Sequence, residues 1–443
     1  MKEAPALAPL IANDDIGQTI YALAAEIFPI CRSITGDGVR RTIDVLSRHI
    51  PVHRHEIPTG TAVLDWEVPK EWSITDAYIK NAKGERVVDF HRSNLHIVNY
   101  SAPIKAKIPI SELKAHIFTL PDQPDLIPYR TSYYNETWGF CMSHRQLAAL
   151  EEGGGEYEVV IDSRLEAGAL TWGEYLHAGE TTDEVLLSAH VCHPSLANDN
   201  CSGLALLAVL AHKLTDIRTR LSYRILFVPG TVGAIAWLAA NEAHLDRIKH
   251  GLVVSCVGDA GGPTYKRSRR GDAIIDRAMA HVLRASGAPV NLLDFFPYGY
   301  DERQYCSPGF NLPVGLFQRS QFATFPEYHT SADNLDFIRA EHLAASFRWI
   351  VQTLDILERN RFMINRHPKG EPQLGRRGLY GAIGGDRNAW TRNMAMLWTL
   401  NLSDGQHSLL DIAERANLSF DVIASIADVL EDHGLLAASS ESG

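Results

Sequence analysis

The sequence has few cysteines, no long apolar run and no excess of basic residues. Six cysteines in 443 residues, none of them in a CxxC pair, do not make a disulfide framework and favour a reducing compartment. No apolar run approaches the roughly 20 residues of a membrane-spanning helix. Lys and Arg number 42 against 53 Asp and Glu, and this net charge of −11 does not favour binding to nucleic acid or anionic lipid. We therefore expect a cytoplasmic protein with no nucleic-acid partner and no membrane partner.

The N-terminal segment also lacks the pattern of a secretory signal. Pro5 and Pro9 interrupt its short apolar run, and Glu3 precedes that run. A signal peptide instead has a basic start followed by an uninterrupted apolar stretch. The composition is that of an ordinary globular protein, with 45% hydrophobic and 21% charged residues, and the length predicts two or three domains.

Three kinds of sequence pattern along the chain predict three domains and an α/β fold class. Residues 1–60 and 166–365 form the first domain, because apolar β-rich runs alternate with helical patterns and predict a mainly parallel sheet flanked by helices. Residues 61–165 hold short alternating segments separated by Gly, Asn and Pro, which predicts a small inserted β domain that acts as a lid. Residues 366–443 begin with a Pro/Gly/Arg-rich linker and continue with three helical patterns and a short β-like end, which predicts a winged-helix module.

The last helical pattern of this module is acidic. The stretch SFDVIASIADVLEDH contains no Lys or Arg, and its acidic residues are Asp421, Asp428, Glu431 and Asp432. Such a helix would be repelled by the phosphates of DNA. We therefore interpret the module as a packing or oligomerisation domain, which makes a homo-oligomer possible, and we disfavour a transcription regulator.

Four polar residues fall at strand ends or in adjoining loops of the α/β region. His190 ends EVLLSAH, Asp199 precedes the helical pattern SGLALLAVL, Asp259 ends GLVVSCVGD and His329 lies in EYHTSADN. Each has a simpler reading, since a lone His is usually a hydrogen-bonded core residue and an Asp before a helix is usually a cap. Together they suit zinc, because imidazole and carboxylate are zinc ligands and a shared carboxylate suits two ions.

Several longer stretches carry a family resemblance. They are CRSITGDG (31–38), HVCHPSLANDNCSG (190–203), GDAGGPTYKRSRRGD (258–272), YDERQYCSPGFNLP (300–313) and EYHTSADNL (327–335). Their order resembles that of the zinc aminopeptidase and glutamate carboxypeptidase superfamily. Over almost its whole length, the sequence more closely resembles a group of bacterial aminopeptidase-like proteins that are named as polysaccharide biosynthesis proteins. The resemblance implies a zinc-aminopeptidase-like fold with the inserted β domain and the winged-helix module.

The resemblance also implies a set of metal ligands. His190, Asp199 and His329 would bind zinc, with Asp199 as the bridging residue if two ions bind and Asp259 completing the second site. The superfamily has an Asp two positions after the first His, where this chain has Cys192. His193 is the candidate to replace that Asp, either by orienting a ligand or as a ligand itself.

A departure from the superfamily lies in ILFVPGTVG (225–233). Active aminopeptidases of the superfamily have two adjacent Glu there, one of them the general base, whereas this chain has Gly230 and Thr231. Neither residue can accept a proton from water at neutral pH. The candidates for a substitute base are Glu302 in YDERQ, Asp301 beside it, and Glu327, which is close to His329 in the sequence. The alternative for the first two is a structural ion pair with Arg303.

The basic run YKRSRRGD (265–272) follows Asp259. It is either a solvated loop or a clamp for a substrate carboxylate or phosphate, because Arg pairs with such groups in a bidentate manner. The predicted substrate-binding residues are Arg269, Arg270, Arg303 and Tyr328.

These observations favour a hydrolase with one or two zinc ions. It would cleave an amide bond next to a free amine, in a small peptide or an aminoacylated small molecule. The alternative is a non-catalytic protein that keeps the fold and binds a metal or another ligand, and the feature that favours it is Gly230.

Overall fold

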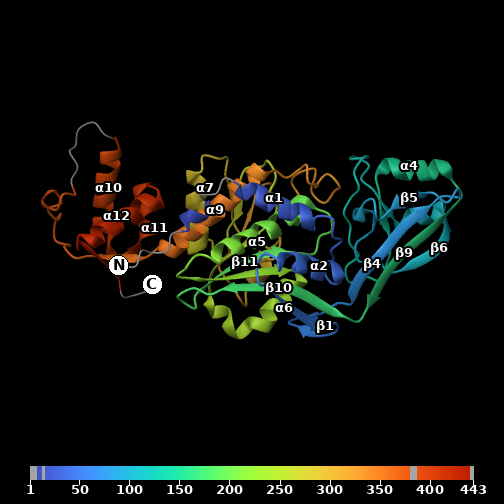
Figure 1. Ribbon diagram of the computed structural model, residues 1–443, viewed down its shortest axis with the longest axis horizontal. Coiled ribbons are helices and arrows are strands. Elements are labelled where there is room, and N and C mark those ends of the chain that lie inside the picture. The colour runs from blue at the N-terminus through green and yellow to red at the C-terminus, as the bar shows by residue number, and fades with distance from the viewer. Residues whose placement is uncertain (1–6, 12–14, 380–386, 440–443) are drawn as a thin grey trace. The chain divides into compact units, whose positions relative to one another are not determined.

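The fold is built on a central eight-stranded sheet, shown in the computed structural model of the chain (Figure 1), which describes residues 7–11, 15–379 and 387–439. Pro5, on which part of the signal-peptide prediction depends, lies outside the described residues. Four of the seven strand pairs are parallel and the others antiparallel. The strand order is β1 (His53–Pro58), β10 (Ala169–His177), β12 (Ser222–Val228), β11 (Glu184–His190), β13 (Ile248–Val254), β16 (Val314–Gln318), β14 (Thr264–Lys266) and β15 (Asn291–Leu293).

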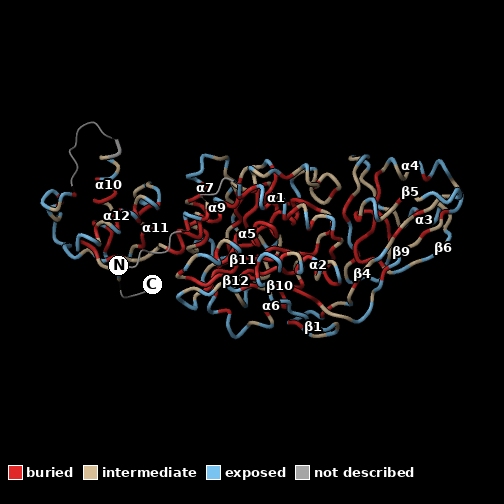
Figure 2. Tube along the Cα trace, viewed as in Figure 1, coloured by how far each residue is buried: buried red, intermediate tan, exposed pale blue. Residues whose placement is uncertain are grey.

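Helices cover both faces of this sheet. In Figure 1, α1 (Ile16–Ile27), α2 (Asp37–Leu46) and α5 (Gly203–Leu214) lie on one face, and α6 (Val232–Asn241) lies on the other. Strand β11 is buried along its whole length, as expected for a parallel strand covered on both sides, and Figure 2 shows the burial of the central strands. The predicted α/β fold class is confirmed. Further helices are α7 (Ile274–Ala285), α8 (Glu302–Tyr305) and α9 (Ala340–Arg359).

The parallel strands end together at one edge of the sheet. His190, the last residue of β11, pairs in register with Val228, the last residue of β12. Ser188 of β11 pairs with Val253 near the end of β13. Residues that follow these strands are therefore brought to the same edge, which is where ligands bind in sheets of this kind.

A second, antiparallel sheet lies in the β-rich insert. Tyr157, Val159 and Ile161 of its longest strand point into a local apolar core. A loop of the insert reaches the site edge, because the Tyr129 N–H donates to the carbonyl oxygen of His329 at 2.8 Å. The strand order is β5 (Arg86–Asp89), β4 (Glu71–Lys80), β9 (Glu156–Glu166) and β6 (Ile104–Pro109). Smaller elements are β2 (Ala62–Val63), β3 (Trp66–Glu67), α3 (Ile110–Leu113), β7 (Ile117–Phe118), β8 (Phe140–Cys141) and α4 (His144–Gly153).

The C-terminal part combines three helices with a three-stranded antiparallel sheet. Ser408 begins α11 with a capping box, in which its side chain accepts from the Asp411 N–H. Residues 362–365, which the sequence assigned to the α/β domain, form the central strand of this sheet. The elements are β17 (Phe362–Asn365), α10 (Arg387–Leu402), β18 (Asp404–Ser408), α11 (Leu409–Ala416), α12 (Phe420–Asp432) and β19 (Leu436–Ala438).

Among the described residues, no helix is both long enough and apolar enough to span a membrane.

Candidate metal centre

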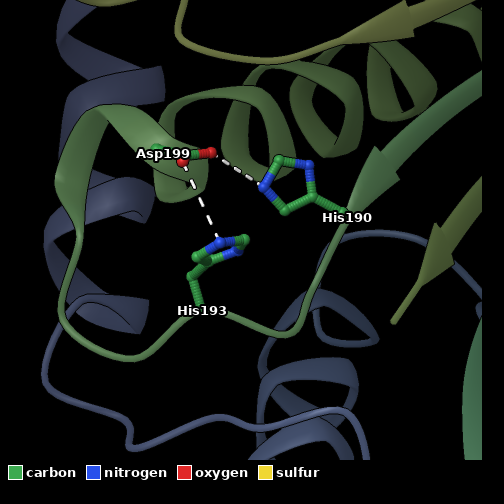
Figure 3. Close-up of side chains that lie close together, drawn as sticks. All are labelled: His190, His193 and Asp199. Atoms are coloured by element: carbon green, nitrogen blue, oxygen red, sulfur yellow. Dashed lines mark hydrogen bonds and ion pairs between the residues drawn. The ribbon is translucent and has the colours of Figure 1, made fainter. Parts of the chain in front are cut away.

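Three imidazoles surround the carboxylate of Asp199. His190 Nε2 lies 2.8 Å from Oδ1, and His329 Nε2 lies 3.0 Å from Oδ2. His193 Nε2 lies 4.0 Å from Oδ2. Figure 3 shows His190 and His193 pointing toward this carboxylate from the end of β11 and the loop that follows it. His190 and Asp199 are buried, whereas His329 is partly exposed.

The surroundings fix the charge state of this group. Burial alone would raise the pKa of Asp199, but the charges and hydrogen bonds of His193, His190 and His329 hold it well below its usual value. Burial holds the pKa of His193 well below its usual value, against the opposing effect of Asp199. An ionised carboxylate beside a neutral imidazole is the protonation state in which both groups can bind a metal ion.

Arg32 holds the loop that carries His193. Its Nε donates to the His193 carbonyl oxygen at 2.7 Å, and its Nη2 donates to the Pro194 carbonyl oxygen at 2.9 Å. The Arg32 side chain is almost completely buried. Arg32 lies in CRSITGDG, one of the stretches that carry the family resemblance. Its role could not be predicted, because nothing local in that stretch reveals a partner far along the chain.

Asp333 holds the backbone next to Asp199. Its Oδ1 accepts from the Asn198 N–H at 2.6 Å and its Oδ2 accepts from the Asp199 N–H at 3.0 Å. Burial raises the pKa of Asp333 to about 8. Through the two hydrogen bonds, the Asp333 side chain positions Asp199 by way of the main chain, as a support for a ligand.

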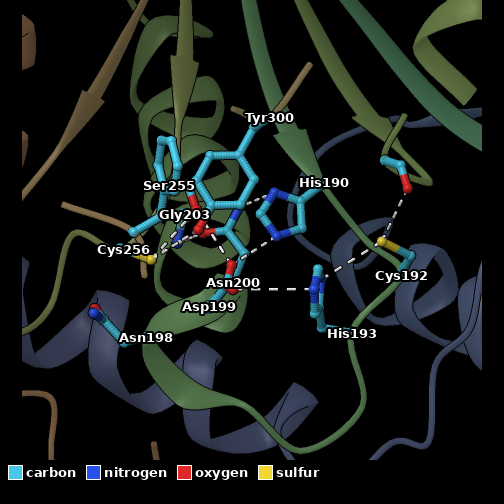
Figure 4. Close-up of polar contacts among 12 residues, drawn as sticks. His190, Cys192, His193, Asn198, Asp199, Asn200, Gly203, Ser255, Cys256 and Tyr300 are labelled. Carbon is cyan, nitrogen blue, oxygen red and sulfur yellow. Dashed lines mark hydrogen bonds and ion pairs between the residues drawn. The ribbon is translucent and has the colours of Figure 1, made fainter. Parts of the chain in front are cut away.

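Aromatic rings and a thiol set the orientation of the imidazoles. Tyr300 stacks on His190 with ring centroids 4.7 Å apart, and Tyr328 stacks on His329 at 3.9 Å. Cys192 Sγ lies 3.5 Å from His193 Nδ1 (Figure 4). Tyr328, predicted to bind substrate, thus packs directly against a candidate ligand, and Cys192 contacts the imidazole that was expected to replace the missing Asp.

Asp301 lies beside this group with both carboxylate oxygens buried. Among the described residues, neither oxygen has a hydrogen-bond partner. Burial raises the pKa of Asp301 to about 7, an effect that the nearby His190 opposes. A Cβ atom added to Gly230 would lie 3.4 Å from Asp301 Oδ1 and 3.2 Å from His190 Cβ. The carboxylate therefore occupies the space next to Gly230, where the resemblance led us to expect a Glu.

Glu302, the other base predicted in YDERQ, is engaged in an ion pair. Lys266 Nζ lies 2.6 Å from Glu302 Oε1, and both side chains are fully buried. The partner is thus Lys266, not Arg303, whose guanidinium lies 5.8 Å from the centroid of the Tyr298 ring. Burial raises the pKa of Glu302 against the opposing effect of Lys266. Because its Oε1 already accepts from the Lys266 ammonium group, a role as the base would break this buried pair, and the structure does not favour it.

Asp259 is not brought to the imidazoles. Its Oδ2 accepts from Asn198 Nδ2 at 2.8 Å, and its Oδ1 accepts from the Ser320 hydroxyl at 2.6 Å and from the Gly261 N–H at 2.7 Å. Strand β13 ends at Val254, five residues before Asp259. Ser255 follows the strand end instead, and its hydroxyl lies 3.4 Å from Asp199 Oδ1.

The predicted arginine clamp is also directed elsewhere. Arg269 Nη1 donates to Asn311 Oδ1 at 3.0 Å, and Arg270 Nε donates to the Asn311 carbonyl oxygen at 2.9 Å. Both contacts are exposed. These arginines therefore fix a surface turn, which corresponds to the solvated-loop alternative.

Donor atoms of the kinds that zinc binds lie close together at this site. The candidate ligand atoms of His190, His193 and Asp199 all lie within 4.8 Å of one another. Imidazole and carboxylate are common zinc ligands, with bonds of about 2.0–2.2 Å. The Asp301 oxygens add a buried polar group without a partner in the described chain, next to the same imidazole. The residues present therefore suit a zinc ion.

Comparison with known proteins identifies the family. Residues 21–360 match the family described as "Domain of unknown function (DUF4910)". The chain belongs to this family. Residues 361–438 match a winged helix-turn-helix family, which confirms the predicted winged-helix module.

One relative with a similar sequence over most of the chain comes from Clostridium acetobutylicum. It is named a polysaccharide biosynthesis protein with aminopeptidase-like domain and is 49% identical over 418 residues, covering 94% of this chain and 96% of the relative. A crystal structure of a protein from the same organism, described as a peptidase, has a TM-score of 0.93 at 47% identity, covering 98% of this chain and 99% of the other. The resemblance stated from the motifs is therefore confirmed.

More distant structures have the same fold. A zinc aminopeptidase from Bacillus subtilis has a TM-score of 0.54 at 12% identity, covering 76% of this chain and 94% of the other. A peptidase M28 precursor from Shewanella amazonensis has a TM-score of 0.54 at 13% identity, covering 80% and 95%. This chain therefore has the fold of these aminopeptidase structures.

Proposed function

We propose that this protein is a zinc-dependent hydrolase that cleaves an amide bond next to a free amine, in a small peptide or an aminoacylated small molecule. The observation that carries the proposal is the convergence of three imidazoles on one buried, ionised carboxylate at the ends of parallel strands. The proposed ligands are His190, His193, Asp199 and His329. The name of the relative favours an aminoacylated sugar among these substrates.

The donor set supports one zinc ion rather than two. Asp259, which would complete a second site, has its oxygens occupied by Asn198, Gly261 and Ser320. A bound zinc ion supplies a Lewis acid and lowers the pKa of a water molecule toward neutrality. Tyr300 and Tyr328 keep the imidazoles of His190 and His329 in place by stacking.

We assign the role of proton acceptor to Asp301. Its pKa of about 7 means that it takes up and releases a proton near neutral pH. In the proposed reaction, Asp301 accepts a proton from the attacking water and returns it to the amine that leaves. Because both of its oxygens are free of partners in the described chain, this transfer breaks no existing hydrogen bond there.

A second candidate function is a non-catalytic binding protein that retains the metal site. Gly230 and Thr231 favour it, because they stand where the superfamily has two Glu, and neither supplies a carboxylate. In this case the site would hold a metal or another ligand without turning over a substrate.

The first experiment measures the metal content of the purified, untagged chain by elemental analysis, with Asp199→Asn as a comparison. We expect one zinc per chain in the wild type and less in the variant, which loses a charged ligand. The absence of metal after incubation with zinc would contradict both the ligand assignment and the hydrolase.

The second experiment tests the proton acceptor with Asp301→Asn. We expect hydrolysis of aminoacyl p-nitroanilides to fall by about 100-fold or more, because an amide cannot accept the proton, while the zinc content stays unchanged. Asp294→Asn is the matched control, since Asp294 is 88% exposed and paired with Arg267. Bound zinc without turnover of any free-amine substrate by the wild type would instead support the binding protein.

A further inference from the structure

A cavity of about 600 Å³ lies in the same compact unit as the imidazoles but is lined by other residues. One wall comes from the end of α1 and the start of α2, and the other from β4 and residues 90–95. Ser195 and Ser331 complete the lining. Small-molecule sites have volumes of about 300–1,000 Å³, so the cavity is large enough for a ligand of its own.

Two arginines give this cavity a positive charge. Arg41 of α2 and Arg92 both line it, and within residues 7–11, 15–379 and 387–439 neither guanidinium has an ion-pair partner. The acidic residue of the lining, Asp37, is itself paired with Arg40, with 3.5 Å between Oδ1 and Nη1. Guanidinium groups bind phosphate in a bidentate manner, so this charge favours a ligand with a phosphate group.

The rest of the lining combines hydroxyl and amide groups with aromatic carbon. Phe28, Trp72 and Phe90 supply the aromatic carbon. A phosphate ion alone would fill only a small part of the volume, and the remainder offers hydrogen bonds together with apolar faces. A sugar ring has the matching surface, with hydroxyls at its edge and C–H groups on its faces. The hydroxyl and amide groups include those of Ser73, Thr75, Ser93, Asn94, Ser195 and Ser331.

We propose that this cavity binds a phosphorylated sugar, whose phosphate is held by Arg41 and Arg92. The site is separate from the imidazole cluster but is connected to it through two loops. Ser195 lies two residues after His193, and Ser331 lies two residues after His329. Asn94 Nδ2 donates to Ser195 Oγ at 2.8 Å, so a ligand that contacts Asn94 also restrains the loop of His193.

The test measures, by isothermal titration calorimetry, the affinity of the full chain for glucose 1-phosphate, glucose and inorganic phosphate in turn. We expect glucose 1-phosphate to bind, and each of the other two to bind at least about tenfold more weakly. Combining Arg41→Ala with Arg92→Ala should weaken the binding of glucose 1-phosphate by about tenfold or more. Arg145→Ala is the matched control, because Arg145 is an exposed arginine of the insert that pairs with Asp125 outside the cavity.

The other outcomes overturn the proposal. Equal affinity for phosphate and glucose 1-phosphate would make the cavity a simple anion site, and equal affinity for glucose would remove the role of the arginines. Undiminished binding by a folded double variant, or no binding of glucose 1-phosphate to the wild type, would also reject it. Because binding is measured directly, the result is independent of whether the chain hydrolyses amides.

Discussion

Gly230 leaves no side chain between His190 and Asp301. A Cβ at this position would lie 3.2 Å from His190 Cβ, a close contact, and 3.4 Å from Asp301 Oδ1. From the sequence alone, a Glu introduced here would be expected to restore a general base. The structure reverses that expectation, because the carboxylate of Asp301 already fills the space, and two adjacent carboxylates repel each other.

We predict that Gly230→Glu lowers hydrolysis by about tenfold or more, because the new side chain displaces Asp301. Adding Asp301→Gly to this variant should recover part of the lost activity, since it moves the single carboxylate from position 301 to position 230. The measurement is kcat/KM with a free-amine substrate, with zinc content as a check. A single Gly230→Glu variant more active than wild type would show that Asp301 is not the base.

His250 gives a prediction for stability. Burial, helped by the charges of Arg220 and Lys249, lowers the pKa of this imidazole from 6.5 to about 4. In the unfolded chain the imidazole takes up a proton near pH 6.5, but in the folded chain only near pH 4. The free energy of unfolding therefore falls as the pH drops from 6.5 to 4, by on the order of 3 kcal/mol, and His250 has no effect above this range.

The prediction is checked by urea unfolding of wild type and His250→Gln between pH 7 and pH 5. We expect the variant to lose less stability than the wild type over this interval, because one proton uptake has been removed. His53→Gln, at an exposed position of β1, should follow the wild type. Identical pH dependence of His250→Gln and wild type would refute the assignment.

At the scale of elements, β14 and α8 are joined by the buried pair of Lys266 and Glu302. Lys266 also donates to the Tyr298 carbonyl oxygen at 2.7 Å. The turn between these two contacts carries Tyr300 and Asp301, so Lys266 is a positioning residue for both. Its connection to the site passes through the backbone, since its ammonium group contacts neither the imidazoles nor Asp301.

We predict that Lys266→Met destabilises the fold by about 3–5 kcal/mol, because it leaves the Glu302 carboxylate buried without its partner. Combining it with Glu302→Leu should restore much of this stability, as buried pairs replaced by apolar residues often do. If the double variant folds, a positioning role predicts a lower kcat with altered zinc affinity. A double variant with wild-type kcat would limit the pair to a structural role.

The elements also show what the sequence could predict. The apolar run EVLLSAH ends with His190, and strand β11 ends at the same residue. The run GLVVSCVGD continues its apolar pattern past the end of β13, so periodicity could not reveal that Ser255, rather than Asp259, follows the strand. Likewise, Lys266 and Glu302 are 36 positions apart, and no local pattern indicates such a pair.

At the scale of the whole molecule, the last helix of the winged helix-turn-helix module, α12, is acidic. Asp421 and Asp428 of α12 pair with Arg359 at 2.8 Å and Arg361 at 2.5 Å. The positive charges of Arg359 and Arg361 are thus neutralised by these ion pairs, which reduces their attraction for DNA phosphates. The module matches a winged helix-turn-helix family, but α12 has no basic residue, whereas a helix that binds DNA needs positive charge.

We predict that the full chain does not bind double-stranded DNA above background at moderate salt, as measured by fluorescence anisotropy. Asp421→Lys combined with Asp428→Lys should increase nonspecific binding, because the reversal of charge removes the repulsion. Tight binding of a defined sequence by the wild type would instead assign the module to DNA recognition.

Arg32 has a consequence for the order in which the molecule is assembled. The hydrogen bond from its guanidinium to the His193 carbonyl joins residues 161 positions apart in the chain. During synthesis on the ribosome, the segment with Arg32, which contains no proposed ligand, emerges first. The loop of His193, which Arg32 supports, is synthesised much later. The set of proposed ligands is complete only when His329, the last of them in the sequence, has been synthesised. A chain that begins after residue 35 would keep every proposed ligand and still lack the contacts that hold the loop of His193.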